Sequence, residues 1–121
     1  MVNVVYCMRR RADLTLEQFL DHWGRVHAPI VTANLSLLRI ADYRRIVPKA
    51  HPMAAQIERR NLSQAPYDGI ALLTWASDED LQASLQDPQA IEAQRAIARD
   101  EKLFVDADRS CRWVTEAIHH L

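Results

Sequence analysis

Residues 14–31 read LTLEQFLDHWGRVHAPIV, and the spacing of their apolar positions predicts an α-helix with one buried face. Asp13 and Thr15 stand where helix N-caps are expected. Pro29 lacks a backbone donor and disfavours helical geometry at the preceding residue. We therefore expect the helix to kink or break near His27 and to restart at Pro29. The face expected to be buried carries Leu16, Phe19, Leu20, Trp23, His27, Ile30 and Val31.

On both sides of this helix the pattern changes to the alternating spacing that is typical of strands. The predicted strands cover residues 2–9, 38–47, 67–76 and 110–118. Two further helices are predicted at 77–86, capped by Ser77 or Asp78, and at 88–104, with Pro88 in its first turn. The proline-rich connection 48–66 is long for a compact domain, so it is a candidate lid or functional insertion, with a short helix near 53–62.

The predicted order is strand, helix, strand, and then the same again, which indicates an α+β, ferredoxin-like fold. We expect a four-stranded antiparallel sheet with helices on one face, and residues 1–121 forming a single domain. The strands at 2–9 and 67–76 are apolar on both sides and should be central. Because no further layer is predicted, a second copy of the chain is the simplest cover for the other face, which gives a dimeric α+β barrel.

Composition excludes several classes of function. The chain has 121 residues and a formal net charge of −1, which provides no general attraction to nucleic acid or anionic membranes. No stretch of about 18 apolar residues is present, and the N-terminus has its charges after its apolar run, the reverse of a secretion signal. A cytoplasmic location is therefore expected, with Cys7 and Cys111 as buried free thiols.

The segment 14–30 resembles the EthD-like family of dimeric α+β barrel proteins, named for a component of an ethyl tert-butyl ether degradation cluster. Residues 67–77 and 100–117 look like the same family, whereas 48–66 is longer than its usual connection. The resemblance implies a ferredoxin-like dimer with a ligand-sized cavity between sheet and helices, and it implies no single reaction. The motif is carried by Leu14, Glu17, Phe19, His22, Trp23, His27, Ala28, Pro29 and Ile30.

His27 is the leading candidate for chemistry. It falls on the buried face of the helix, where free carbonyls near Pro29 could hold one ring nitrogen while the other moves protons. A structural histidine that fastens the helix end is the competing interpretation. His22 precedes it by five positions, about 140° away on a regular helix, so the two do not form a metal pair and His22 belongs at the surface or rim.

Asp68 opens an otherwise apolar strand, so its carboxylate needs a partner or water. It is the second catalytic candidate, as an orienting group for His27, a base or a holder of a substrate hydroxyl. The alternative is turn chemistry, since Asp-Gly is a common turn dipeptide. Asp106 is expected to cap a loop or to pair with an arginine.

Aromatic residues on several elements should line one cavity and bind the substrate, although ordinary core packing explains them equally well. These candidates are Tyr6, Trp23, Tyr43 and Trp75. Trp113 is assigned to the dimer interface. The basic pairs Arg44–Arg45 and Arg59–Arg60 are interpreted as solvated faces, with a clamp for an anionic ligand as the alternative.

We therefore expect an enzyme that needs no cofactor and no metal. Its reaction would be proton transfer, of the isomerase, dehydratase or cyclase type, on a small cyclic or aromatic oxygenated metabolite. The alternatives are a non-catalytic ligand-binding or accessory protein of a degradation pathway, and a haem-handling protein with His27 as axial ligand. The expected partners are a small-molecule ligand and a second copy of the chain, with no nucleic acid and no membrane.

Overall fold

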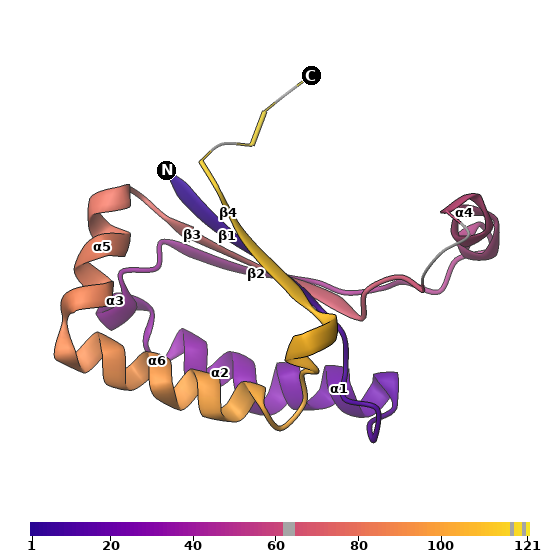
Figure 1. Ribbon diagram of the computed structural model, residues 1–121, viewed down its shortest axis with the longest axis horizontal. Helices are drawn as coiled ribbons and strands as arrows, with labels where there is room; N and C mark the ends of the chain where they lie inside the picture. Colours follow the sequence, from indigo (N-terminus) through magenta and orange to yellow (C-terminus); the bar gives the residue numbers. More distant parts are fainter. Residues whose placement is uncertain (62–64, 117, 120) are drawn as a thin grey trace.

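The computed structural model describes residues 1–61, 65–116, 118–119 and 121. A single four-stranded antiparallel sheet forms its centre, with the strand order β2-β3-β1-β4 (Figure 1). The two apolar strands predicted to be central are β1 and β3, as expected. The strands are β1 (Val2–Met8), β2 (Asp42–Ile46), β3 (Gly69–Trp75) and β4 (Cys111–Thr115).

The register of the sheet determines which side chains face the helices. Tyr6 of β1 lies opposite Ala71 of β3 and Arg112 of β4. Since successive side chains in a strand point to opposite faces, these three share one face with the other even-numbered residues of β1. Asn3 and Cys7 belong to the opposite face.

The predicted helix at 14–31 is present, and the disturbance expected near His27 takes the form of a π-helical segment that ends at His27. Thr15 caps its start in a reciprocal capping box with Gln18. It runs through α1 (Leu16–His22), a π-helical segment (Trp23–His27) and α2 (Ala28–Thr32). The Ala28 amide bonds to the Trp23 carbonyl, five residues back, and this wider turn accommodates the proline without ending the helix.

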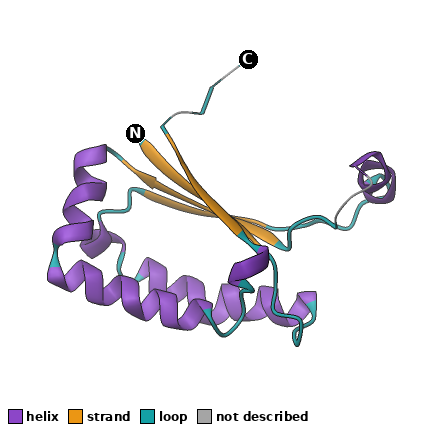
Figure 2. Cartoon of the chain, in the orientation of Figure 1, coloured by secondary structure: helices purple, strands orange, loops and turns teal. Residues whose placement is uncertain are grey.

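Apart from the helix in the 48–66 connection, the remaining helices lie on the same side of the sheet as α1 and α2 (Figure 2). Ser77 and Asp87 cap α5 and α6 through side-chain bonds to backbone amides, and Pro88 opens α6 as predicted. Among the described residues, no helix covers the other face of the sheet. These elements are α3 (Leu35–Leu38), α5 (Asp78–Gln86), α6 (Pro88–Glu101) and a 3₁₀ turn (Ala107–Arg109).

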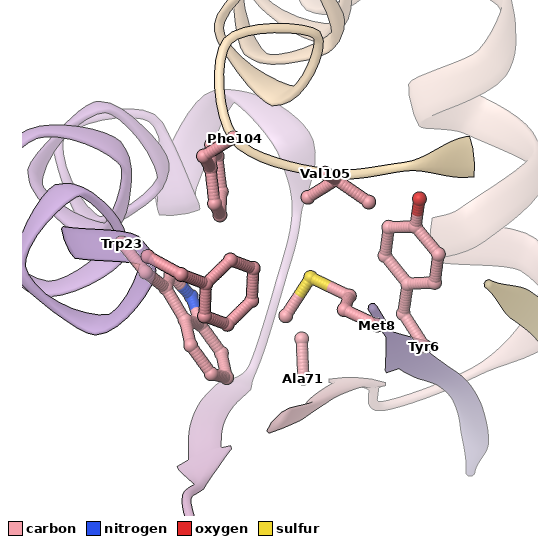
Figure 3. Close-up of a cluster of buried hydrophobic side chains, with 7 residues drawn as sticks. Tyr6, Met8, Trp23, Ala71, Phe104 and Val105 are labelled. Carbon is pink, nitrogen blue, oxygen red and sulfur yellow. The ribbon is translucent and has the colours of Figure 1, made fainter. Parts of the chain in front are cut away.

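Two clusters of buried side chains fill the space between sheet and helices. The first joins Trp23 to Met8 and Ala71 of the sheet and to Phe104, which follows α6 (Figure 3). The second lies under α3 and α6 and includes Trp75. Members of both clusters line the cavity described below.

Some predicted boundaries are wrong. The strand predicted at 38–47 begins only at Asp42, because Leu38 ends α3 and Arg39 adopts a left-handed conformation with φ of 57°. The predicted strand 110–118 ends at Thr115, and its residue 117 lies outside the described residues. The helix predicted at 88–104 is also shorter than expected, since α6 ends at Glu101.

The connection 48–66 contains the expected short helix, α4 (Ala54–Asn61), which stands away from sheet and helices (Figure 1). Its predicted end at residue 62 lies outside the described residues. Met53 and Ile57 are more than half exposed along this segment. Its position beside neither face of the sheet gives no support to a lid over this chain's own cavity.

Candidate functional site

A cavity of about 420 Å³ lies between the sheet and the helical layer. Its walls are mostly apolar, with a small number of polar groups among them, as is usual for small-molecule sites. All four aromatic residues predicted from the sequence line it, and so does His27. These five, Tyr6, Trp23, Tyr43, Trp75 and His27, are joined by Glu101 and Arg112.

His27 is buried, with 5% of its surface exposed, and it is held by a carboxylate. Its Nδ1 lies 2.8 Å from Oδ2 of Asp100, while its Nε2 lies 4.0 Å from Oε1 of Glu101. A neutral ring that donates Nδ1–H to Asp100 leaves Nε2 as an acceptor on the cavity side. The expected carbonyl partner near Pro29 is therefore replaced by Asp100, at the end of α6.

His22 reaches the same carboxylate. Its Nε2 lies 3.1 Å from Oδ2 of Asp100, and both imidazole rings pack 4.9 Å from the ring of Phe104. The prediction that His22 and His27 point in different directions assumed a regular helix. In the π-helical segment, residues five apart come close to one face, and the two rings converge on Asp100.

The polar groups of the cavity wall include an ion pair and a stacked cation. Arg112 donates to Oε2 of Glu101 at 3.1 Å, and its guanidinium lies 3.9 Å from the centre of the Tyr6 ring. Burial and the charge of Glu101 raise the pKa of Tyr6, and Arg112 opposes that rise. Tyr6 is therefore a neutral hydroxyl at physiological pH.

The aromatic walls are fixed by their own hydrogen bonds. The Trp23 indole donates to the Tyr43 hydroxyl at 3.0 Å, and the Trp75 indole donates to the Leu38 carbonyl at 2.9 Å. Burial is the main cause of the raised pKa of Tyr43. Satisfied indole and phenol groups keep the rings in one orientation, so the cavity has defined walls.

Asp68 is not part of this cavity, which corrects its sequence-based assignment as a partner of His27. Its Oδ1 pairs with the Arg10 guanidinium at 2.7 Å, and its Oδ2 accepts the Arg10 amide at 2.7 Å. The carboxylate thus satisfies its need for partners locally, at the turn that precedes β3. Asp106 pairs with Arg109 at 3.9 Å, as its alternative role predicted.

The other candidates lie outside the cavity. His51 accepts the Met53 amide in the connection before α4. Arg44 pairs with Asp42 at 2.6 Å on an exposed face, whereas Arg45 lies over the Trp23 ring at 5.3 Å. In the described part of the chain, no group of three or more His, Cys, Asp or Glu side chains is arranged to hold a metal ion.

Sequence reasoning missed Asp100, Glu101 and Arg112 as site residues. One signal was available: Asp100 and Glu101 occupy the last turn of a helix, where the helix dipole disfavours negative charge. Two acids in that position indicate that tertiary partners compensate them. Arg112 carries no comparable local signal, because only the strand register brings it across from Tyr6.

The comparisons with known proteins give a consistent fold. The family model described as EthD domain matches residues 11–108. The chain is similar to a solved ethyl tert-butyl ether D (EthD) family protein from Bacillus halodurans C-125. That similarity has a TM-score of 0.66 and 15% identity, over 98% of this chain and 99% of that chain.

Two further solved structures share the architecture. One is a dimeric protein of unknown function with a ferredoxin-like fold from Bacteroides fragilis, with a TM-score of 0.62, 9% identity, and 96% and 95% of the two chains covered. The other is a dimeric ferredoxin-like protein of unknown function from Jannaschia. Its TM-score is 0.57 and its identity 11%, and the match covers 96% of this chain and 98% of that chain. No curated protein matches the chain. The described helices include none long and apolar enough to cross a membrane.

Proposed function

Because the chain belongs to the EthD domain family, whose model matches residues 11–108, we propose that its cavity binds a small cyclic or aromatic oxygenated molecule. We propose further that His27 transfers a proton to or from this molecule without a bound cofactor. The volume of about 420 Å³ suits a molecule of two or three fused rings, and the aromatic walls favour a planar one.

The observation that carries the proposal is the pairing of His27 with Asp100. A carboxylate 2.8 Å from Nδ1 selects the tautomer whose Nε2 accepts a proton, and it stabilises the ring once that proton arrives. Burial of both side chains keeps this geometry fixed. General acid–base catalysis by a positioned imidazole contributes about 10²–10⁴-fold to a rate.

Glu101 and Arg112 support the assignment by their position across from Nε2. The gap of 4.0 Å between Nε2 and Oε1 of Glu101 is too long for a direct hydrogen bond and leaves a substrate oxygen or C–H within reach of both. Arg112 and the neutral Tyr6 hydroxyl are donors on the cavity wall, and in this proposal they stabilise the negative charge that develops on a substrate oxygen.

We also propose that a second copy of the chain covers the open face of the sheet. Trp113 and Ile46 lie on that face with 48% and 51% of their surfaces exposed. Two proteins of similar fold are described as dimeric. An apolar sheet face without a helical layer is what a face-to-face dimer would bury.

Binding is tested by thermal unfolding with three probes: coumarin, 1-naphthol and 1,4-naphthoquinone. A ligand that binds only the folded state raises the melting temperature. We expect at least one ring class to raise it, with a smaller rise in Trp75→Ala, which removes part of the wall. Absence of any shift with all three would contradict a ligand-binding cavity for this class of molecule.

Catalysis is tested separately, through deuterium incorporation from D₂O at the acidic carbon of 2-tetralone, followed by NMR. We expect the protein to accelerate exchange and His27→Gln to lose about 10²-fold or more of that acceleration. The matched control is His51→Gln, which makes the same change outside the cavity. Equal exchange by His27→Gln and the wild type would contradict the role of His27.

The alternatives give different results in the same experiments. A non-catalytic binding protein would show the thermal shift without the exchange. A haem-handling protein would develop a Soret absorbance band when titrated with haem.

A further inference from the structure

The two cysteines, 104 positions apart in the chain, are neighbours in the sheet. Cys7 of β1 and Cys111 of β4 are directly paired in the antiparallel register, and both are free thiols. Paired residues of antiparallel strands have Cα atoms about 4.5–5.5 Å apart and side chains on the same face. Disulfides span Cα distances of about 4.4–6.8 Å, so the Cα separation of a directly paired couple lies in the range that a disulfide bridges.

The two thiols differ in exposure and in partners. Cys7 is buried, with 5% of its surface exposed, whereas Cys111 is exposed. The Tyr67 hydroxyl lies 3.2 Å from Sγ of Cys111, and the Arg9 guanidinium lies 4.2 Å from the centre of the Tyr67 ring. Tyr67 and Cys7 are thus the hydrogen-bonding neighbours of the Cys111 sulfur, and Arg9 stacks on the Tyr67 ring.

The titration behaviour of the neighbours agrees with this geometry. Burial, followed by the proximity of Cys111, raises the pKa of Cys7, so its thiol keeps its proton. The hydrogen bond to Cys111, followed by burial, raises the pKa of Tyr67, so its hydroxyl also remains a donor. Both thiols lie on the open face of the sheet, where Cys111 is exposed on the single chain, so the proposal requires that hydrogen peroxide also reaches Cys111 in the proposed dimer.

We propose that Cys7 and Cys111 form a reversible redox pair that responds to hydrogen peroxide. The Cys111 thiolate attacks one peroxide oxygen, the O–O bond breaks, and Cys111 sulfenic acid and hydroxide form, the latter taking up a proton to give water. The Cys7 sulfur then attacks the Cys111 sulfur, the S–O bond breaks, and the Cys7 proton leaves with the hydroxide as a second water. Peroxide is reduced to two waters, and two thiols are oxidised to one disulfide.

Formation of this disulfide would tie edge strand β4 to central strand β1. Arg112, the next residue after Cys111, faces the cavity from the other side of β4. The cross-link would also close a loop of nearly the whole chain, which restricts the unfolded state. We therefore expect oxidation to raise the melting temperature, and a thiol reductant to reverse the rise.

The proposal is tested on the reduced, assembled protein with one equivalent of hydrogen peroxide. We expect the intact mass to fall by two hydrogens, both free thiols to disappear, and a peptide map to join the Cys7 and Cys111 peptides within one chain. Dithiothreitol should restore both thiols. Thiols that remain reduced because the assembly occludes Cys111, or a cross-link between two chains, would overturn the proposal.

Single variants assign the two roles, after circular dichroism confirms that each is folded. In Cys7→Ser the reaction should stop at Cys111 sulfenic acid, which dimedone traps. In Cys111→Ser the buried Cys7 should react many-fold more slowly than Cys111 does in Cys7→Ser. Equal or faster reaction of Cys7 would refute the assignment of Cys111 as the peroxide-reactive thiol.

Discussion

The carboxylate of Asp100 forms hydrogen bonds with two imidazole rings, at 2.8 Å from Nδ1 of His27 and at 3.1 Å from Nε2 of His22. Asp100 lies in the last turn of α6, where backbone carbonyls point outward and the helix dipole opposes negative charge. Two N–H donors and the packing of Phe104 against both rings offset that cost. The same contacts fix the orientation of His27, so stability and the proposed chemistry depend on one carboxylate.

Asp100→Asn should therefore lower both activity and stability. The amide has similar size but carries no charge and replaces one acceptor oxygen with a donor, so both imidazoles lose a charged partner and at least one loses its acceptor. A hydrogen bond to a charged group contributes about 1.5–3 kcal/mol, and we expect a loss of that order in urea unfolding. The 2-tetralone exchange rate should fall about 10²-fold or more. Unchanged exchange would remove Asp100 from the proposed mechanism.

Tyr43 is expected to make the folded protein less stable as the pH rises into the alkaline range. Burial raises its folded pKa above the unfolded value of about 10, so between the two values the unfolded chain loses this proton first. Its stabilising contribution is complete below about pH 10 and is lost as pH rises through the folded pKa. We expect the urea concentration at the unfolding midpoint to be lower at about pH 11 than at about pH 8.

Tyr43→Phe should have a shallower decline over the same pH range, although Tyr6 and Tyr67 leave part of it in place. Stability at neutral pH should also drop, because the Trp23 indole loses its acceptor. A decline as steep as that of the wild type would contradict the role given to Tyr43.

The residue-scale predictions from sequence succeeded where one element decides the outcome. The helical spacing around His27 is sufficient to bury its side chain. The contact with Asp100 depends on how α6 packs against the π-helical segment, which no local pattern encodes. Asp68 was assigned wrongly to the side of His27, because its partner Arg10 follows β1 and is brought beside it only by the pairing of β1 with β3.

At the scale of elements, the π-helical segment Trp23–His27 is the feature that places the site. It absorbs Pro29 and brings His22 and His27 to one carboxylate. A regular helix would have turned one ring away. The sequence indicates a disturbance at Pro29 but not its form, because a kink, a break and a π turn all remove the same hydrogen bond.

The contact between this segment and β3 is testable at Gly69. A Cβ at Gly69 would collide with the fully buried ring of Trp23. We expect Gly69→Ala to lower the free energy of unfolding by about 1–3 kcal/mol, as overpacked cores do, measured by urea denaturation.

The matched control is Gly24→Ala in the π-helical segment itself. There the new Cβ meets Nη1 of Arg45 at 2.8 Å, the end of a flexible side chain that can move away. Its effect should be within about 0.5 kcal/mol or stabilising, since alanine favours helix over glycine. A loss in Gly24→Ala as large as that in Gly69→Ala would contradict the assigned packing.

At the scale of the whole molecule, the sheet has one face covered by helices and one open face (Figure 2). The layers were predictable, because strand alternation and helical stripes each require a cover. The protruding position of α4 was not, because its exposed residues make few contacts that a local pattern could reflect. Some strands were predicted to extend several residues too far along the chain, because apolar residues continue beyond the hydrogen-bonded part of the strand.

The proposed dimer predicts that Trp113→Glu produces monomers, because it places a charge on the open face. Leu103→Glu is the matched control: Leu103 is 58% exposed, comparable to Trp113 at 48%, but it follows α6 on the helical side. Light scattering after size-exclusion chromatography should show a dimer for the wild type and for Leu103→Glu. A dimeric Trp113→Glu variant would argue against this face as the interface.

The central claim, that Asp100 holds His27 with Nε2 available to a substrate, is tested most directly by the ring nitrogens themselves. A long-range ¹H–¹⁵N NMR spectrum of the folded protein, with His27→Gln used to assign the signals, identifies which nitrogen carries the proton. The predicted result is a neutral His27 ring protonated at Nδ1, with this preference lost in Asp100→Asn. A His27 ring protonated at Nε2 in the wild type would contradict the claim.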